Sequence, residues 1–326
     1  MTAFGLADLA AAGRVVARAM LPTPQICWPL LSEAVGAEVW VKHENHTPIG
    51  AFKLRGGLVH LDRLAREPSP PAGVVSATRG NHGQSLAFAA RATGLRAVVV
   101  VPGGNNPEKN AAMSALGAEV VVAGRDFQES RGVAAELAES RRLRMVPPFH
   151  PDLVLGVATY AAELLAAVAD LDTVYVPVGM GSGIAGLIGV RDLLGLRTEI
   201  VGVVAAGADA YAQSFAAGRV VSTAAALTFA DGVACREPDP EAVDVIAKGA
   251  ARVLTVPDDE TAAAMRLMLR ATHNLPEPAG AIALAALLAE RDLQQGRRVA
   301  VVLSGGNADA ASLAAVLAGR TPAPLA

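Results

Sequence analysis

Short apolar segments that indicate strands alternate with helical segments along most of this chain, and a glycine-rich or polar loop joins several of the strands to the helix that follows. In the middle of the chain the pattern predicts three strand–helix units: 74–76 with 80–93, 97–101 with 107–116, and 119–122 with 126–140. Such alternation is typical of parallel sheets covered by helices. Ligands of these sheets bind at the carboxyl ends of the strands, so the loops there are the candidate sites.

Proline-rich segments at 67–73 and 147–151 bound this middle block. Before it we predict a helix at 5–19, a strand at 38–42 and a helix at 53–66. After it we predict strands at 174–178, 200–204, 252–256 and 299–303, helices at 152–168, 184–194, 258–272, 278–290 and 307–317, and an irregular segment at 206–252. A length of 326 residues suits about two domains. We expect a large domain of 1–66 plus 148–326 and a small mobile domain of 67–147.

Composition excludes several classes of protein. Hydrophobic residues make up 52% and charged residues 18%, which predicts a folded core, and the net charge of −3 argues against a nucleic-acid-binding or basic membrane-surface protein. The longest uncharged run, 173–190, contains Pro177 and five glycines, so we expect no membrane-spanning helix. The start of the chain does not resemble a signal peptide. The two cysteines, Cys27 and Cys235, are far apart and indicate no disulfide framework, which favours the reducing cytoplasm.

The first candidate loop ends where Lys53 opens a predicted helix. The positive end of the helix dipole lies there and favours loss of the ammonium proton. A neutral amine is a nucleophile, so Lys53 is a candidate catalytic residue. A single lysine is far more often a solvated surface residue, and it is the other loops that favour the catalytic interpretation.

The second loop, Gly80-Asn81-His82-Gly83, follows a strand and begins a helix. Free backbone N–H groups at a helix N-terminus bind anions, and the two polar side chains add donors. An ordinary helix cap is the alternative. The fourth loop, at 304–307, places Ser304 after the last strand, where its hydroxyl can bond a heterocycle nitrogen; a plain turn is the alternative there.

The third loop, 179–183, has alternate glycines that let successive N–H groups converge on a phosphate. An overlapping G-x-G-x-x-G at 181–186 lacks the acidic residue expected about 20 positions later, where 203–205 are apolar, so dinucleotide binding is disfavoured. Met180 also breaks the G-x-S-x-G pattern of a hydrolase elbow.

Together these loops resemble those of the fold-type II pyridoxal-phosphate enzymes, and within them the serine/threonine dehydratase and serine racemase family. Five segments match in order and approximate spacing over nearly the whole chain: 42–57, 80–84, 179–183, 230–233 and 304–307. The resemblance implies a two-lobed α/β fold like the β subunit of tryptophan synthase, each lobe a mainly parallel sheet covered by helices. It also implies a pyridoxal 5′-phosphate-dependent ammonia-lyase, or dehydratase, that acts on a small amino acid.

The resemblance further implies a role for each loop. Lys53 would carry the cofactor as a Schiff base, Phe52 would pack against its ring, Asn81 would bond its phenolic oxygen, and Ser304 would face its pyridine nitrogen. The glycine loop would hold the phosphate through Gly179, Met180, Gly181, Ser182 and Gly183. The second loop would receive the substrate carboxylate through Thr78, Arg79, Gly80, Asn81 and His82.

The implied reaction is an α,β-elimination from a 3-hydroxy-amino acid of the threonine or serine type. The freed Lys53 amine would remove the α-proton as general base. The β-hydroxyl would leave with help from an acid, and hydrolysis would release a 2-oxo acid and ammonia. A neutral hydroxyl at Ser304 would make the ring a mild electron sink, which suits elimination.

Arg79 departs from the family pattern, which usually has a small hydroxyl residue there. In racemase-type members that hydroxyl acts as acid and base opposite the lysine, and a guanidinium is a poor base. An amino-acid racemase is therefore the less favoured alternative. We expect Arg79 to contact the substrate carboxylate, a second acidic group or the cofactor. A module that only binds a phosphate ligand would have no use for Lys53.

Other departures concern metals and the substrate. Acidic residues of metal-binding members are replaced by Val204 and Ala210, so we expect no metal site, despite Asp209 nearby. The segment 156–159 replaces a more polar family segment, and its apolar Val157 and Ala158 favour phenylserine as an alternative substrate, beside 3-hydroxyaspartate.

The remaining expectations concern the other histidines and the assembly. No third ligand matches the spacing of His43 and His46, so these two are expected to be structural or on the surface. His60 and His273 are expected to be structural, and His150 to order a turn. The resemblance favours a homodimer, and the few residues after Leu317 resemble the short, catabolic-type dehydratases without a regulatory domain.

Overall fold

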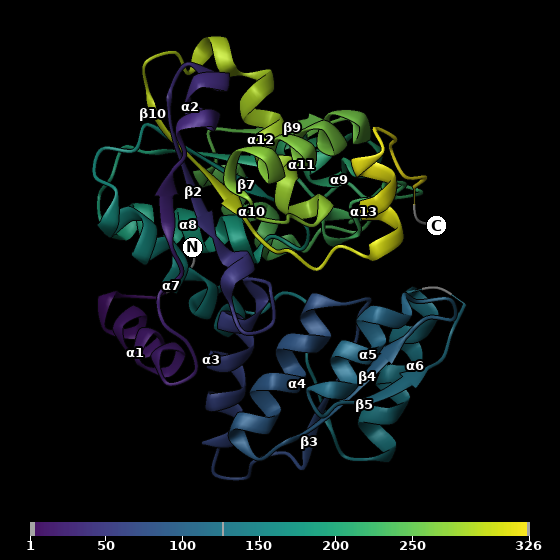
Figure 1. The fold of residues 1–326 in the computed structure, drawn as a ribbon. Coiled ribbons are helices and arrows are strands. Elements are labelled where there is room, and N and C mark those ends of the chain that lie inside the picture. Colours follow the sequence, from purple (N-terminus) through teal and green to yellow (C-terminus); the bar gives the residue numbers. More distant parts are fainter. Residues whose placement is uncertain (1–3, 126, 325–326) are drawn as a thin grey trace.

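The computed structural model describes residues 4–125 and 127–324, which form the two sheets that lie one above the other in Figure 1. The larger sheet has the strand order β1-β2-β10-β7-β8-β9, and the smaller sheet β5-β4-β3-β6. In the larger sheet β1 runs antiparallel to β2 and the other pairs are parallel, as are all pairs of the smaller sheet. The expected α/β fold with two mainly parallel sheets is confirmed.

The larger sheet consists of β1 (Gln25–Cys27), β2 (Glu38–His43), β7 (Thr173–Pro177), β8 (Glu199–Ala205), β9 (Arg252–Val256) and β10 (Arg298–Leu303). The smaller sheet consists of β3 (Gly73–Ala77), β4 (Arg96–Val101), β5 (Glu119–Val122) and β6 (Arg144–Met145). The first helices are α1 (Leu6–Ala17), α2 (Pro29–Val35), α3 (Lys53–Ala65), α4 (Asn81–Thr93), α5 (Pro107–Ala115) and α6 (Phe127–Ser140). The later helices are α7 (Pro151–Ala167), α8 (Ser182–Leu193), α9 (Ala210–Ala217), α10 (Pro240–Gly249), α11 (Asp258–Thr272), α12 (Pro278–Ala289) and α13 (Ala310–Leu317).

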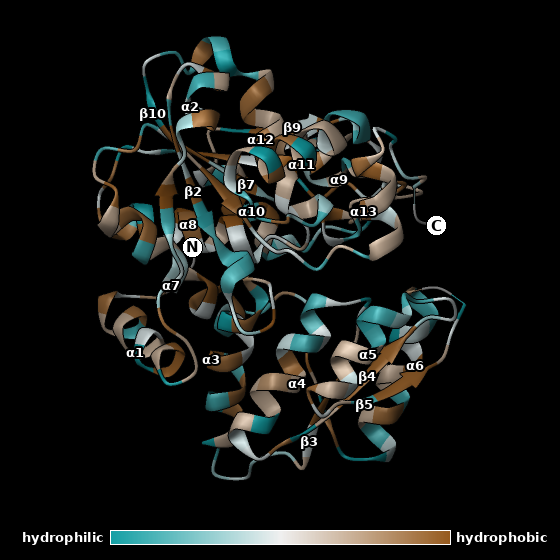
Figure 2. Cartoon of the chain, viewed as in Figure 1, coloured by the Kyte–Doolittle hydropathy of each residue, from teal (hydrophilic) through white to brown (hydrophobic). Residues whose placement is uncertain are grey.

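Helices cover both faces of each sheet, as continuous apolar strands require. On the larger sheet one buried cluster joins α2, α11 and α12, and another joins α7, α8 and α10. On the smaller sheet α3, α4 and α5 share one cluster, whereas α6 belongs to the other. The strands β4 and β5 are brown in the hydropathy colouring of Figure 2 because they consist largely of valines, and successive valines enter the two clusters alternately.

Most predicted elements are confirmed, but the prediction of an irregular segment at 206–252 is wrong. That segment contains α9 and α10. Its small residues give little helical periodicity, which is why α9 escaped the pattern. The start of α10 carries a clear signal, because the Asp239 side chain accepts from the N–H groups of Glu241 and Ala242 and Pro240 is the first helical residue. The short β1, α2 and β6 were also not predicted.

All strands of the smaller sheet lie within the predicted small domain, but α3, which precedes that domain, packs on the same sheet. Its Leu54, Leu58 and Leu61 share a buried cluster with Val74 of β3 and Val99 of β4. The division into a large domain and a small mobile domain of 67–147 therefore stays a prediction.

A buried ion network fixes the first turn of α3. The Arg55 side chain is fully buried, and its Nε donates to Glu44 Oε2 at 2.7 Å. Its Nη1 donates to Glu163 Oε1 of α7 at 2.7 Å and to Thr159 Oγ1 at 3.0 Å. Lys42 of β2 also donates to Glu163, at 2.6 Å. Because two carboxylates surround the guanidinium, α3 is tied both to the loop before it and to α7.

Replacing Arg55 with Met should destabilise the protein by about 3–5 kcal/mol, because Glu44 would be left as an unpaired buried carboxylate. Arg66→Met is the matched control, since Arg66 also pairs with a carboxylate, Asp62, but its own side chain is 64% exposed. The control should cost far less, because a solvent-exposed ion pair contributes little to stability. Urea denaturation of both variants measures the difference, and equal losses would contradict the role given to Arg55.

Candidate functional site

Lys53 stands apart from the other lysines of the chain. There are four: Lys42, Lys53, Lys109 and Lys248. Three of them pair with the carboxylates of Glu163, Asp231 and Asp244, respectively. Within the described residues, the polar partner of Lys53 Nζ is a hydroxyl, Ser182 Oγ, at 3.4 Å. Burial without a compensating carboxylate lowers the pKa of Lys53 to about 8.

The glycine loop lies directly against this amine. Ser182 and Gly183 open α8, and Gly181 before them has a φ of +93°, the left-handed region that favours glycine. A Cβ on Gly179 would lie 2.3 Å from the carbonyl oxygen of Gly232. The loop therefore has no room for side chains at these positions, and the free N–H groups of the first turn of α8 form an anion cradle.

Phe52 connects the lysine to that cradle. The Phe52 ring contacts the Tyr160 ring edge-on, with the two centroids 6.3 Å apart. Lys53 Nζ lies 5.1 Å from the centroid of the Phe52 ring. The Tyr160 hydroxyl donates to the Gly183 carbonyl at 3.1 Å. The Phe52 N–H donates to the Ser304 carbonyl at 3.0 Å. The first, third and fourth loops thus meet around one position, as the sequence predicts.

The second loop joins them through the N-terminus of α4. Thr78 Oγ1 accepts from the Gly80 N–H at 3.2 Å and shapes the turn before the helix. Asn81 Oδ1 accepts from Asn307 Nδ2 of the fourth loop at 2.8 Å. His82 is buried, and its surroundings lower its pKa to about 3, mainly through burial and also through the nearby Lys53. At neutral pH His82 is therefore an uncharged imidazole.

Glu277 is a site residue that the sequence did not reveal. It is buried, and its carboxylate accepts from Asn81 Nδ2 at 2.9 and 3.0 Å. Burial, followed by the charge of Asp231, raises the pKa of Glu277 to about 7. An acid just before the wholly apolar segment 278–289 was the available signal, because such an acid needs a polar partner.

One more unpredicted contact joins the part of the chain that forms the smaller sheet to the part that forms the larger one. Lys109 of α5 pairs with Asp231. Asp231 directly precedes Gly232, whose carbonyl oxygen lies against Gly179 of the glycine loop. The Lys109 stem covers Gly80, where an added Cβ would lie 3.1 Å from its Cδ. Lys109 and Asn81 both come from the part of the chain that forms the smaller sheet, whereas Asp231 and Glu277 do not.

The remaining polar residues take structural roles. His43 accepts from Trp28 Nε1 at 3.0 Å, and burial lowers its pKa to about 4. The His150 side chain accepts from the Asp152 N–H and caps α7, which confirms its expected turn role. In the described part of the chain His60, His150 and Asp152 offer ligand atoms within 4.8 Å of one another, but Asp152 also pairs with Arg63. Nearby His60 Nδ1 lies 3.1 Å from the same carboxylate.

Comparison with known proteins agrees with this geometry. The family model described as "Pyridoxal-phosphate dependent enzyme" matches residues 16–305. The chain belongs to this family. Its cofactor is pyridoxal 5′-phosphate, and the glycine cradle and the Lys53 amine beside Ser182 suit a phosphate and an aldehyde.

Curated relatives of this family member are ammonia-lyases. The L-threonine ammonia-lyase of Geobacter sulfurreducens is 35% identical over 88% of this chain and 71% of its own length. The L-threo-3-hydroxyaspartate ammonia-lyase of Saccharomyces cerevisiae is 29% identical over 93% of both chains. Other relatives, named as biosynthetic threonine dehydratases, are longer, and the chain spans 54% of their length. The expected enzyme class, a pyridoxal-phosphate-dependent ammonia-lyase, is confirmed.

Solved structures share the whole fold. The processed form of threonine deaminase isoform 2 from Solanum lycopersicum superposes with a TM-score of 0.88 and 28% identity, covering 98% of this chain and 95% of its own. A pyridoxal 5′-phosphate-dependent aspartate racemase superposes with a TM-score of 0.88 and 29% identity, covering 95% and 98%. The fold is thus common to lyases and racemases, and the residues of the site have to discriminate between them.

The lowered pKa of Lys53 predicts a pH-dependent capture of the cofactor. Only the neutral amine attacks an aldehyde, so the rate at which apoenzyme binds pyridoxal phosphate covalently should rise about tenfold per pH unit below 8 and level off above it. An ordinary lysine, with a pKa near 10.4, would show no plateau before pH 10. Stopped-flow absorbance between pH 6 and pH 10 measures the profile, and a rate still rising at pH 10 would contradict the burial argument.

Proposed function

We propose that this enzyme converts a 3-hydroxy-amino acid of the threonine or serine type to a 2-oxo acid and ammonia by α,β-elimination. The observation that carries the proposal is the half-buried Lys53 amine, which lies 3.4 Å from Ser182 of the glycine cradle and has no carboxylate partner among the described contacts. Bound pyridoxal phosphate supplies an aldehyde and an electron-withdrawing ring. An amine that is neutral near pH 8 can then remove a proton from the α-carbon of a substrate.

The other site residues hold and orient the cofactor. In this proposal the first turn of α8, from Ser182 and Gly183, binds the phosphate together with Gly179, Met180 and Gly181, and Phe52 packs on the ring. Ser304 is buried beside the Phe52 backbone, and its uncharged hydroxyl, which donates to the Ala279 carbonyl at 3.4 Å, would face the ring nitrogen of the cofactor. Because serine is not a carboxylate, it would not keep the ring nitrogen protonated. A ring that is not protonated withdraws electrons less strongly, and this suits rapid elimination.

The N-terminus of α4 receives the substrate carboxylate in this proposal. The free N–H groups of Asn81 and His82 lie at the positive end of the helix, and the neutral His82 adds no charge. Thr78 and Gly80 shape the turn before them. Arg79 lies half-buried in the same turn. In this proposal its guanidinium binds an acidic group of the ligand.

The structure removes one argument about the substrate. Val157 and Ala158 are fully buried in the core, and a Cβ on Gly186 of α8 would lie 3.1 Å from the Ala158 nitrogen. They pack α7 against α8 and therefore give no support to phenylserine. Arg79 and the hydroxyaspartate ammonia-lyase relatives make 3-hydroxyaspartate the second candidate substrate. Racemisation stays less favoured, because Arg79 is a poor acid–base group.

Arg79→Ala should lower kcat/KM for the preferred substrate about 10- to 150-fold, because a hydrogen bond to a charged group contributes about 1.5–3 kcal/mol. The measurement is 2-oxo acid formation from L- and D-threonine, serine, phenylserine and 3-hydroxyaspartate. Arg91→Ala, an exposed arginine in the last turn of α4, is the matched control and should retain full activity.

Two outcomes would contradict this part of the account. Unchanged turnover of every substrate by Arg79→Ala would remove the role of Arg79. Release of the opposite enantiomer without 2-oxo acid by the unchanged enzyme would replace the lyase with a racemase.

We also propose that the enzyme is a cytoplasmic homodimer. Both cysteines are free, as a reducing compartment allows. No helix in the described ranges is long and apolar enough to cross a membrane.

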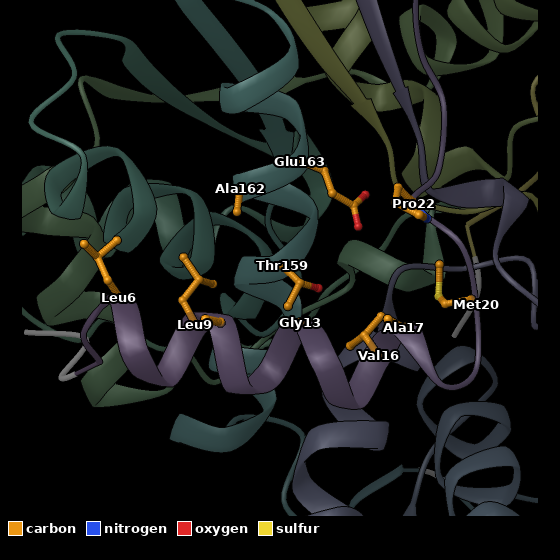
Figure 3. A pocket seen from close by; sticks show the side chains of 11 residues that line it. Leu6, Leu9, Gly13, Val16, Ala17, Met20, Pro22, Thr159, Ala162 and Glu163 are labelled. Carbon is orange, nitrogen blue, oxygen red and sulfur yellow. The ribbon is translucent and has the colours of Figure 1, made fainter.

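An apolar groove runs between α1 and α7 in Figure 3, lined by Leu6, Leu9 and Met20 among others. Leu6 and Leu21 are 60% and 84% exposed beside it, which supports burial against a second copy.

Sedimentation velocity tests this assembly. The enzyme should sediment as a dimer, and Leu6→Glu should shift it toward monomer by placing a charge in the contact. Leu293→Glu is the matched control, because Leu293 is similarly exposed, at 64%, and does not line this groove. A monomer at micromolar concentration, or equal effects of the two variants, would contradict the proposal.

A further inference from the structure

Hydrogen bonds fix which way the Asn81 amide faces. Asn307 Nδ2 donates to the Ile49 carbonyl at 2.9 Å, and a carbonyl can only accept, so this end of Asn307 is the donor. The same nitrogen lies 2.8 Å from Asn81 Oδ1, which accepts its second hydrogen. The other end of the Asn81 amide, Nδ2, must therefore face Glu277.

Glu277 is well placed to hold that nitrogen. Its backbone N–H donates to the Gly305 carbonyl at 3.0 Å, next to Ser304. A Cβ on Gly305 would lie 2.6 Å from Glu277 Oε1, so the carboxylate rests on the backbone of the fourth loop. Asn81 Nδ2 is nearly equidistant from the two carboxylate oxygens, at 2.9 and 3.0 Å. One N–H shared between these oxygens satisfies the contact and leaves the second N–H of the amide for a ligand.

We propose that Glu277 is a positioning residue whose carboxylate holds Asn81 with an amide N–H directed at the phenolic oxygen of the cofactor. The inference rests on the proposed role of Asn81 in cofactor binding. A glutamine at 277 would keep the size but exchange an acceptor for a donor. The Asn81 N–H would then have one neutral acceptor oxygen in place of two oxygens that share a charge, and the amide would be held more weakly.

The charges around Glu277 make this positioning sensitive to pH. Asp231 faces it from the 3-10 turn at 231–233 and disfavours its ionisation, whereas Lys109 of α5 favours it. The Asn307 N–H also favours the carboxylate. With a pKa of about 7, Glu277 offers two acceptor oxygens above neutrality, and below it one oxygen carries a proton. The hold on Asn81 should therefore weaken as the pH falls.

A double-mutant cycle on cofactor affinity tests the inference without reference to activity. Apoenzymes of the wild type, Glu277→Gln, Asn81→Ala and the double variant are titrated with pyridoxal phosphate, and the quenching of protein fluorescence gives the dissociation constants. We expect each single substitution to weaken binding about tenfold at pH 8. The double variant should bind no more weakly than Asn81→Ala, because both substitutions remove the same contact.

The pH profile adds a readout that general damage would not produce. The dissociation constant of Glu277→Gln relative to wild type should rise from near 1 below pH 6 to about 10 above pH 8, since protonated glutamate and glutamine resemble one another. Glu277→Asp keeps the charge but moves it away from Asn81, and we expect a loss of cofactor affinity between those of wild type and Glu277→Gln. Glu290→Gln is the control, because Glu290 pairs with Arg252 and Tyr175 away from the site.

The ways in which the inference can fail are distinguishable. Additive losses in the double variant, or a ratio independent of pH, would overturn the role of Glu277. Unchanged affinity in Asn81→Ala would instead overturn the proposed contact of Asn81 with the cofactor, and the inference with it.

Discussion

The fixed position of the first turn of α3 is the constraint on which the site depends. Arg55 ties this turn to Glu44 and Glu163, and the backbone on its other side pairs with the fourth loop where Ala51 bridges Gly305. Between these two anchors Lys53 has little freedom to move away from the glycine loop. Its amine is desolvated there and meets a hydroxyl in place of a carboxylate, so it stays available for chemistry.

The parts of the chain that form the two sheets both contribute to the proposed site, and they contribute different groups. Loops that follow strands of the larger sheet supply the glycine cradle and Ser304, which are backbone or uncharged groups, and α3, which packs on the smaller sheet, supplies the amine of Lys53. The part of the chain with the smaller sheet supplies Asn81 and Lys109, which reach across to Glu277 and Asp231. A movement of the smaller sheet away from the larger one would break both contacts, so the orientation of Asn81 depends on how the two sheets pack against each other.

The loops of the site could be predicted from the sequence because each lies between a recognisable strand and helix. Lys53, the glycine loop and Ser304 can be identified by residue type at such a position. Glu277 and Lys109 could not be found this way, since their partners Asn81 and Asp231 are distant in sequence and meet only when the two sheets pack. The use of Val157 and Ala158 as evidence for a phenylserine substrate fails for a related reason. The position of a residue on a helix does not show whether its side chain lines a ligand site or packs in the core.

The most direct test of the account is to locate the cofactor on the chain. Purified enzyme is reduced with borohydride and digested, and mass spectrometry then identifies which of the four lysines carries the reduced pyridoxyl group. The account predicts a single modified residue, Lys53, because the other three amines are paired with carboxylates. Modification of Lys42, Lys109 or Lys248 in its place, or of none, would contradict it.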